Sequence, residues 1–442
     1  MIESISVDEL LKKNLKIPDY QRPYKWNRKN IEALLRDITQ AVNDAKKYES
    51  FKYRLGTIIL FKRTPKSNAI TYDIIDGQQR IISLSLIKFV LEKQLPDGIR
   101  NSKFRNKISQ QRIHDNYSLI QEWFHLNNEF ESSFKEAFSK ILEVIVFSVD
   151  NLSEAFQLFD SQNTRGKSLD PHDLLKAYHL REMQDDLEGM RSAVTKWEAK
   201  DSNKIKTLFD LFLFPILNWS RGLKTKPFTA DEIDTYKGIE ATSPYSYAKR
   251  ANQAVPYFQI TEPFTSGKSF FEMVEHYYGL LLEIKSEIIT NPQFSDIKSI
   301  LCNNQTVNSL EELDAVRLPS IGLTHAKNLF FASLLCYYDR FHNFDERVVK
   351  KLFIWAMMIR VDLRRLGFSS INKYAIGSTN ADYSNHIDIF SKIHYSRRHF
   401  EISSINIEVS GNKHLKTDSN RENLYNELNK MKGNNYKNVD FK

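Results

Sequence analysis

The sequence predicts an α+β domain with a small mixed sheet, followed by an all-α helical domain. Strand-like segments rich in β-branched and aromatic residues concentrate early in the chain, as YRLGTIILFK, AITYDIID and LEVIVFSV. From about residue 180, apolar residues recur at helical spacing, as in SFFEMVEHYYGLLLEI. A chain of 442 residues also exceeds a single hydrophobic core. We therefore expect domains at residues 1–180 and 181–408, and a poorly packed or disordered tail at residues 409–442.

Helix and strand signals alternate through the first domain. Ser6 and Glu9 form a capping box that predicts a short helix, and Asn27 is expected to begin an amphipathic one. Between them, the prolines and aromatics of IPDYQRPYKWN favour an extended segment. TPKSN should join the first two strands as an antiparallel pair, and LEVIVFSV should be a further buried strand. Asp170 and Pro171 open the next helix.

Composition narrows the class of protein. The chain has no run of about 18 apolar residues, and its start lacks a basic region ahead of an apolar one, so we expect a cytoplasmic protein without a membrane partner. Two cysteines, Cys302 and Cys336, exclude a disulfide framework or a cysteine zinc site. The net charge of +8 permits phosphate-bearing partners, but it is equally consistent with a solvated, slightly basic surface.

The stretch IIDGQQR places polar residues where a strand is expected to become a helix. The strand ends at Asp76, Gly77 permits a turn, and Gln78, Gln79 and Arg80 begin the helix. A helix N-terminus attracts phosphate through its free N–H groups and dipole, and an arginine there strengthens the attraction. The amides could orient a nucleotide or an attacking water. The alternative is that Asp76 caps the helix and the polar side chains face solvent.

A second Gln-Arg pair lies upstream. Gln21 and Arg22 stand among the aromatic residues of YQRPYKW, a combination that could stack a base and hold phosphate. The alternative is a packed aromatic patch with Arg22 in a structural ion pair. Because both Gln-Arg pairs lie beside expected strand ends, we predict that they form the two sides of a nucleotide pocket.

A third segment, NTRGKSLDPHDLLK, offers Asn163 and Arg165 to complete this pocket, or is only a loop between two helices. Its RGKS string is not a P-loop, because Ser161 stands where that motif needs glycine and the segment follows a helix. The histidines show no metal-ligand spacing. In the second domain, basic residues could hold DNA or could form the solvated face of a core helix: Lys350, Lys351, Arg360, Arg364 and Arg365.

In this order, IPDYQRPYKW, LGTIIL, IIDGQQRIISL and FDSQNTRGKSLDPHDLLK resemble the N-terminal domain family of GmrSD-type, modification-dependent restriction systems. The resemblance covers about residues 8 to 180. It implies a ParB and sulfiredoxin-like fold in which Gly77 to Arg80 contact nucleotide phosphates, while Asp76 orients the loop, a metal ion or a water. It also implies NTP hydrolysis that licenses cleavage of modified phage DNA by an HNH nuclease domain, fused at the C-terminus or carried by a partner.

The histidine-bearing segments late in this chain, NHIDIF and IHYSRRHF, lack the pattern of an HNH nuclease. We therefore expect an NTP-binding and NTP-hydrolysing sensor subunit of a bacterial anti-phage restriction system, which acts on DNA with a separate nuclease. The alternatives are a metal-dependent DNA nuclease that nicks DNA itself and a non-catalytic DNA-binding scaffold. The sequence does not identify the base of the NTP or the DNA modification. It also does not determine the oligomeric state, which could be a homo-oligomer.

This prediction assigns a role to each candidate residue. Asp76, Gln78, Gln79 and Arg80 are the expected catalytic residues, and Mg²⁺ beside Asp76 would offset the triphosphate charge. DNA is expected to contact Arg360, Arg364 and Arg365. The expected nucleotide-binding residues are Gln21, Arg22, Gly77, Gln78, Arg80, Asn163 and Arg165.

Overall fold

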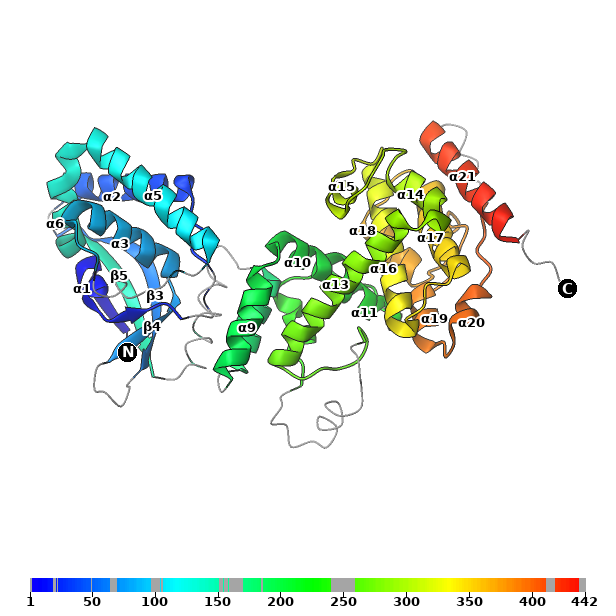
Figure 1. The fold of residues 1–442 in the computed structure, drawn as a ribbon, viewed down its shortest axis with the longest axis horizontal. Coiled ribbons are helices and arrows are strands. Elements are labelled where there is room, and N and C mark those ends of the chain that lie inside the picture. Colours follow the sequence, from blue (N-terminus) through cyan, green and yellow to red (C-terminus); the bar gives the residue numbers. More distant parts are fainter. Residues whose placement is uncertain are drawn as a thin grey trace. The chain divides into compact units, whose positions relative to one another are not determined.

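The computed structural model divides the chain into two compact units (Figure 1). The first comprises residues 1–169 with 176–199, and the second comprises residues 170–175 with 200–442. No helix in the described part of the chain combines the length and apolar composition needed to cross a bilayer. The structure describes residues 2–18, 21, 23–48, 50–63, 70–96, 104, 106–150, 154, 158, 170–183, 186–239, 259–410 and 418–436.

The first unit contains a five-stranded mixed sheet with the order β1-β5-β3-β4-β2. β3 and β4 pair antiparallel, as the sequence predicts, and so do β1 and β5, whereas β3–β5 and β2–β4 pair parallel. The two outermost strands were not predicted, because β1 is only partly buried and β2 has two residues. The strands are β1 (Ile2–Ser6), β2 (Leu15–Lys16), β3 (Tyr53–Arg63), β4 (Thr71–Asp76) and β5 (Leu142–Val149).

Helices pack on this sheet and around one another. The predicted caps are confirmed: Ser6 Oγ accepts from the Glu9 N–H, and Asn27 Oδ1 accepts from the Lys29 N–H. The helices of this unit are α1 (Val7–Lys12), α2 (Arg28–Ala45), α3 (Gln78–Glu92), α5 (Lys107–Leu126), α6 (Glu131–Lys140) and α9 (Leu187–Glu198), while α8 (Pro171–Arg181) contributes residues to both units.

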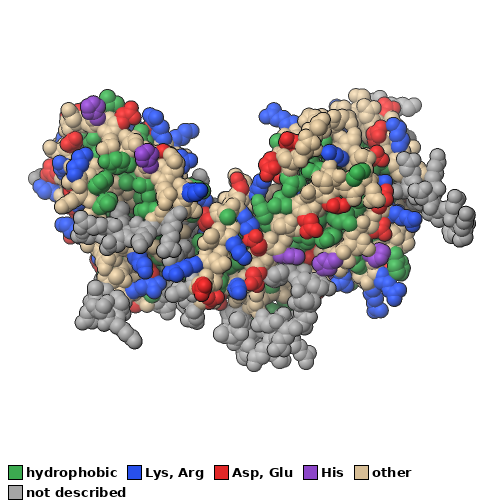
Figure 2. All heavy atoms as spheres, viewed as in Figure 1, with side chains coloured by type: hydrophobic (Ala, Val, Ile, Leu, Met, Phe, Trp, Pro, Cys, Tyr) green, Lys and Arg blue, Asp and Glu red, His purple; other side chains and the backbone are tan. Residues whose placement is uncertain are grey.

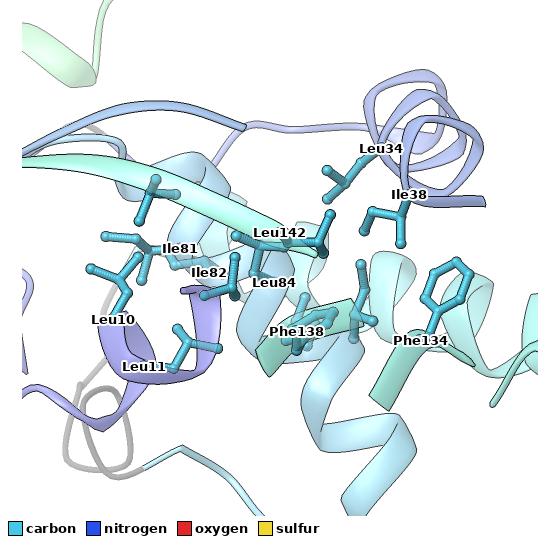
Figure 3. Packing of buried hydrophobic residues seen from close by; sticks show 14 of the residues in the cluster. Leu10, Leu11, Leu34, Ile38, Ile81, Ile82, Leu84, Phe134, Phe138 and Leu142 are labelled. Carbon is cyan, nitrogen blue, oxygen red and sulfur yellow. The ribbon is translucent and has the colours of Figure 1, made fainter. Parts of the chain in front are cut away.

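Helix α3 forms the centre of the first unit's core (Figure 3). Its apolar residues surround the helix, so it is buried on nearly every side, as expected for a helix without a polar face. Even Ser83 and Ser85 are buried, and each donates to the carbonyl four residues earlier. Figure 3 shows the surrounding side chains of α1, α2, α6 and β5, among them Leu10, Leu11, Leu34, Ile38, Phe134, Phe138 and Leu142. The packing of α3 on nearly every side therefore fixes the position of its first turn.

In the described residues of the second unit, the regular secondary structure is helical apart from a single bridge between Ile239 and Thr265, which confirms the predicted all-α architecture. Long α16 and α17 pack against each other, with Trp355 fully buried. The helices are α10 (Ser202–Leu208), α11 (Phe214–Ser220), α13 (Lys268–Thr290), α14 (Ser295–Leu301), α15 (Leu310–Ala315), α16 (Ile321–Phe341), α17 (Glu346–Asp362), α18 (Phe368–Ala375), α19 (Ile389–Tyr395), α20 (His399–Ser403) and α21 (Ser419–Tyr436).

Helix α21 lies in the segment where the sequence predicted a poorly packed tail. Its Arg421 side chain is buried, and it donates to the carbonyls of Val361 (Nε, 3.0 Å) and Asp362 (Nη2, 3.2 Å) at the end of α17. A helix C-terminus leaves such carbonyls without intrahelical partners, so a guanidinium satisfies them well. Leu428 and Met431 are also buried. The expectation is corrected for residues 418–436, because these few contacts suffice to dock an otherwise polar helix.

Asp339 on α16 is a buried carboxylate of the second unit. The Tyr277 hydroxyl donates to its Oδ1 and the Ile260 N–H donates to its Oδ2, each at 2.9 Å. Burial raises the pKa of Asp339 to about 7 in spite of these two bonds.

This raised pKa predicts a pH dependence of stability. The folded state keeps the Asp339 proton at pH values where the unfolded chain has lost it, so stability present below about pH 4 is lost as pH rises towards 7. We expect Asp339→Asn to reduce the fall in the free energy of unfolding between pH 5 and 7.5 by about 2 kcal/mol. Urea denaturation at both pH values measures this. The exposed Asp234→Asn is the control, and equal slopes in the two variants would contradict the prediction.

Candidate functional site

The predicted strand-to-helix junction is present at the end of β4. Asp76 is the last residue of this strand, Gly77 follows with φ +91°, and Gln78 begins α3. A Cβ atom on Gly77 would lie 2.2 Å from Ile58 Cδ1, a side chain fully buried in the core. Both the left-handed backbone and this close approach therefore require glycine at position 77.

The first turn of α3 is open, in the sense that no side chain caps its N–H groups. Ile81 N donates to Gly77 O, so the N–H groups of Gln78, Gln79 and Arg80 have no intrahelical acceptor. The carboxylate of Asp76 forms no hydrogen bond with this turn within the described residues. The alternative in which Asp76 simply caps the helix is therefore not what the structure shows. The turn presents free donors and the positive end of a helix dipole.

The two glutamines of this turn have different environments. Gln79 Oε1 accepts from the N–H groups of Lys25 (2.8 Å) and Trp26 (3.2 Å), and its Nε2 donates to Pro23 O (3.2 Å). Gln79 thus holds the backbone of residues 23–26, a structural role that the sequence did not predict. Gln78 is only 6% exposed, and its buried Oε1 has no hydrogen-bond partner among the described residues. Buried amide oxygens normally accept a hydrogen bond, so the Gln78 Oε1 has acceptor capacity that the described residues do not use.

Arg80 reaches back along β3. Its Nη1 donates to Leu55 O at 2.9 Å, and a Cβ on Gly56 would lie 2.3 Å from the same nitrogen. Gly56 has φ +111° and coincides with a shift in the β3–β5 register. The sequence reasoning missed Gly56, although a glycine inside a strand signals a bulge or a close approach. No carboxylate among the described residues pairs with Arg80.

The upstream segment does reach the junction. Gln21 Nε2 donates to Ile75 O at 2.9 Å, one residue before Asp76. Tyr24 is fully buried, and its hydroxyl lies 2.7 Å from Ser83 Oγ of α3 and accepts from Asn116 Nδ2 at 2.9 Å. Tyr24 therefore fixes the segment rather than offering a face to a base. Three further predicted nucleotide-binding residues, Arg22, Asn163 and Arg165, lie outside the described residues.

An ion triad extends from this segment, with Lys176 and Glu198 buried and Lys25 partly exposed. Lys25 Nζ lies 3.1 Å from Glu198 Oε2, and Lys176 Nζ lies 2.6 Å from Glu198 Oε1. Burial acts to raise the pKa of Glu198, but Lys176 and Lys25 outweigh it, and the pKa is lowered. The segment that Gln79 holds is thereby also joined to the end of α9.

The predicted DNA-binding arginines differ in exposure. Arg360 is only 8% exposed; its Nη1 donates to Leu363 O (2.9 Å), and its Nη2 lies 3.7 Å from the Asp418 carboxylate. Arg360 is therefore not available to DNA, because its side chain bonds to the end of α17 and pairs with the residue that precedes α21. Arg364 and Arg365 are exposed.

One group of metal-ligand residues occurs among the described residues, formed by Asp170, His172 and Asp173. Two of its members already have other partners: Asp170 Oδ1 pairs with Lys206 Nζ at 2.5 Å, and His172 Nε2 lies 2.9 Å from Ser202 Oγ. Asp76 is not part of any such group. A Mg²⁺ ion at Asp76 would therefore need most of its ligands from phosphate and water, as is usual for this ion.

The fold and site together define an α+β domain with an open, arginine-bearing helix N-terminus, joined to an all-α domain. Residues 7–180 match the family model of the GmrSD restriction endonuclease, N-terminal domain, so the chain carries a GmrSD-type N-terminal domain. Residues 190–423, more than half of the chain, match the model described as a family of unknown function (DUF7834), and the chain belongs to that family. Comparison with curated proteins gave no match. The first match indicates a role in a restriction system.

Proposed function

We propose that the start of α3 binds the phosphates of a nucleoside triphosphate, and that the protein is an NTP-hydrolysing sensor subunit of a DNA restriction system. The observation that carries the proposal is the uncapped first turn of α3. Among the described residues, no carboxylate pairs with Arg80 and no donor reaches the buried Oε1 of Gln78. Free N–H groups, a helix dipole and a guanidinium are the donors that phosphate oxygens accept. The family match supports the restriction role.

Each residue then has a distinct task. Arg80 contacts the phosphates with the guanidinium nitrogens that Leu55 O does not occupy. Gln78 orients the attacking water, because its Oε1 has no hydrogen-bond partner among the described residues and can accept from that water. Gln79 is a positioning residue, since its amide is engaged by the backbone of residues 23–26. Mg²⁺ carried by the triphosphate would use Asp76 as its protein ligand and offset the phosphate charge.

Replacing Arg80 tests the nucleotide site. We expect Arg80→Ala to weaken NTP binding about 30-fold, because a hydrogen bond to a charged group contributes about 2 kcal/mol. Arg80→Lys should recover only part of the loss, since it keeps the charge but not the planar fork. Titration calorimetry with the four NTPs and Mg²⁺ measures affinity, and phosphate release measures turnover. The exposed Arg54→Ala on β3 is the control.

Gln78→Ala separates catalysis from binding at the same site. If Gln78 orients water, this variant should lose turnover by about 100-fold with less than a 10-fold change in affinity. Wild-type protein that binds no NTP, or an Arg80→Ala variant with unchanged affinity, would refute the proposal. Metal-dependent nicking of DNA by the purified chain without NTP would instead favour a nuclease.

A separate nuclease partner is part of the proposal. The late histidine-bearing segments NHIDIF and IHYSRRHF lack the pattern of an HNH nuclease, so we assign the cleavage step to another protein. In this arrangement the helical domain senses DNA, and the state of the nucleotide licenses the partner to cut.

A further inference from the structure

A basic and aromatic surface lies where α19 meets α20 in the second unit. We define the α19–α20 surface by its exposed side chains: Lys392, Tyr395, Arg397, Arg398 and Phe400. Tyr395 is 73% exposed and Phe400 is 51% exposed, which is unusual for large aromatic residues. Figure 2 shows Lys, Arg and His side chains gathered over these two helices.

This surface rests on a rigid base. Phe390 and Ile393 of α19 and Ile402 of α20 are buried in the core of the unit, so the two helices are fixed. Glu401 Oε1 accepts from the backbone N–H groups of Arg397 (3.2 Å) and Arg398 (2.9 Å). The turn that presents the two arginines is therefore held by hydrogen bonds, which lowers the entropy cost of ordering them on a ligand.

The cations of this surface form no ion pairs within the described chain. The segment from residue 389 to 400 contains Lys392, Arg397 and Arg398 but no acidic residue, and none of the three forms an ion pair among the described residues. Arg398 Cζ lies 5.9 Å from the ring centre of Phe400. Cations and exposed rings thus alternate over a short distance.

We infer that the α19–α20 surface binds single-stranded or unpaired DNA, with phosphates on Arg397, Arg398 and Lys392 and bases stacked on Tyr395 and Phe400. Proteins that bind single strands combine basic grooves with aromatic rings, because every base has a face to stack while the backbone is uniformly charged. A fully paired duplex offers phosphates but no free base face, so it should bind less well. The inference rests on the DNA-sensing part of the proposed function and not on its nucleotide site.

Fluorescence anisotropy with labelled oligothymidylate and a duplex of the same length, both without NTP, tests this surface. We expect Tyr395→Ala to weaken binding of the single strand about 10-fold, as loss of one stacked base predicts. Tyr395→Phe should stay within about 2-fold, since it keeps the ring. The matched control is Tyr48→Ala, which removes a tyrosine of similar exposure (64%) from the first unit.

The salt dependence of binding tests the phosphate contacts. Arg397→Gln and Arg398→Gln should each reduce the slope of log K against log salt by about 0.7. Lys268→Gln, which removes an exposed lysine of α13, should leave the slope unchanged. Equal losses in Tyr395→Ala and Tyr395→Phe, unchanged slopes in the arginine variants, or binding of duplex as tight as single strand would overturn the inference.

These outcomes are independent of the nucleotide site. Because the DNA assays contain no NTP, an Arg80→Ala variant should bind oligothymidylate as the wild type does. If NTP binding fails but Tyr395→Ala still loses DNA, the nucleotide proposal fails and the DNA surface stands. If NTP binds as expected but Tyr395→Ala binds DNA as the wild type does, only the proposal of the DNA surface is refuted.

Discussion

Gly77→Ala is expected to destabilise the first unit by about 3 kcal/mol or more. A non-glycine residue at φ +91° costs about 1–2 kcal/mol, and forcing a methyl group against buried Ile58 adds about 1–3 kcal/mol. Hydrogen exchange of β3 and β5 peptides under increasing urea reports the stability of this unit separately from the second. NTP binding should fall in parallel, because Gly77 sets the entry of the chain into α3.

A double-mutant cycle separates the two costs. Ile58→Val removes the Cδ1 atom that the new methyl group would meet, at an expected cost of about 1 kcal/mol by itself. The double variant should therefore be more stable than the sum of the two single changes by about 1 kcal/mol or more. Additive effects would show that the backbone conformation alone requires glycine. A Gly77→Ala protein as stable as wild type would contradict the described junction.

Glu198→Gln is expected to destabilise the same unit by about 3 kcal/mol at neutral pH, because it leaves the buried Lys176 ammonium without its carboxylate. Lys176 and Glu198 side chains are only 10% and 12% exposed. The pKa of Glu198 is lowered in the folded state, so its contribution is present above the unfolded pKa and is lost on acidification. The stability difference from wild type should therefore shrink as pH falls below about 4.5.

Lys25→Met provides the matched comparison for this triad. Lys25 pairs with the same carboxylate but is 46% exposed, so its loss should cost less than about 1 kcal/mol. The same exchange experiment on β3 and β5 peptides compares the two variants. Equal effects of Lys25→Met and Glu198→Gln would mean that burial does not govern the strength of this triad.

The sequence predicted the parts of the fold that local signals determine. Ser6 and Asn27 cap helices as expected, and LEVIVFSV forms β5 over its whole length. The strand–glycine–helix junction at Gly77 was also predicted, because alternation, glycine and helical spacing are all readable within a few residues. Strand β1 was missed because its pairing with β5 joins residues about 140 positions apart.

Side-chain roles were harder to predict than elements. Gln78 and Gln79 are identical neighbours in the sequence, yet the Gln78 Oε1 has no partner among the described residues and the Gln79 amide bonds to the backbone of residues 23–26. Arg360 and Arg421 were indistinguishable from surface cations, but both are buried at the carbonyl end of α17. Such roles depend on which backbone groups are left without hydrogen-bond partners by tertiary packing. The periodicity of apolar residues in the sequence does not predict which groups these are.

The hold of Gln79 on residues 23–26 has a thermodynamic consequence. Lys25 of that stretch pairs with Glu198, the last residue of α9, and the chain enters the second unit at Lys200. Suppose that nucleotide binding shifts the equilibrium between two conformations of residues 23–26, and that a partner bound to α9 shifts the same equilibrium. The partner must then change the affinity for nucleotide, and the nucleotide must change the affinity for the partner by the same factor. Reciprocal titrations would then return a single coupling constant, whichever ligand is added first.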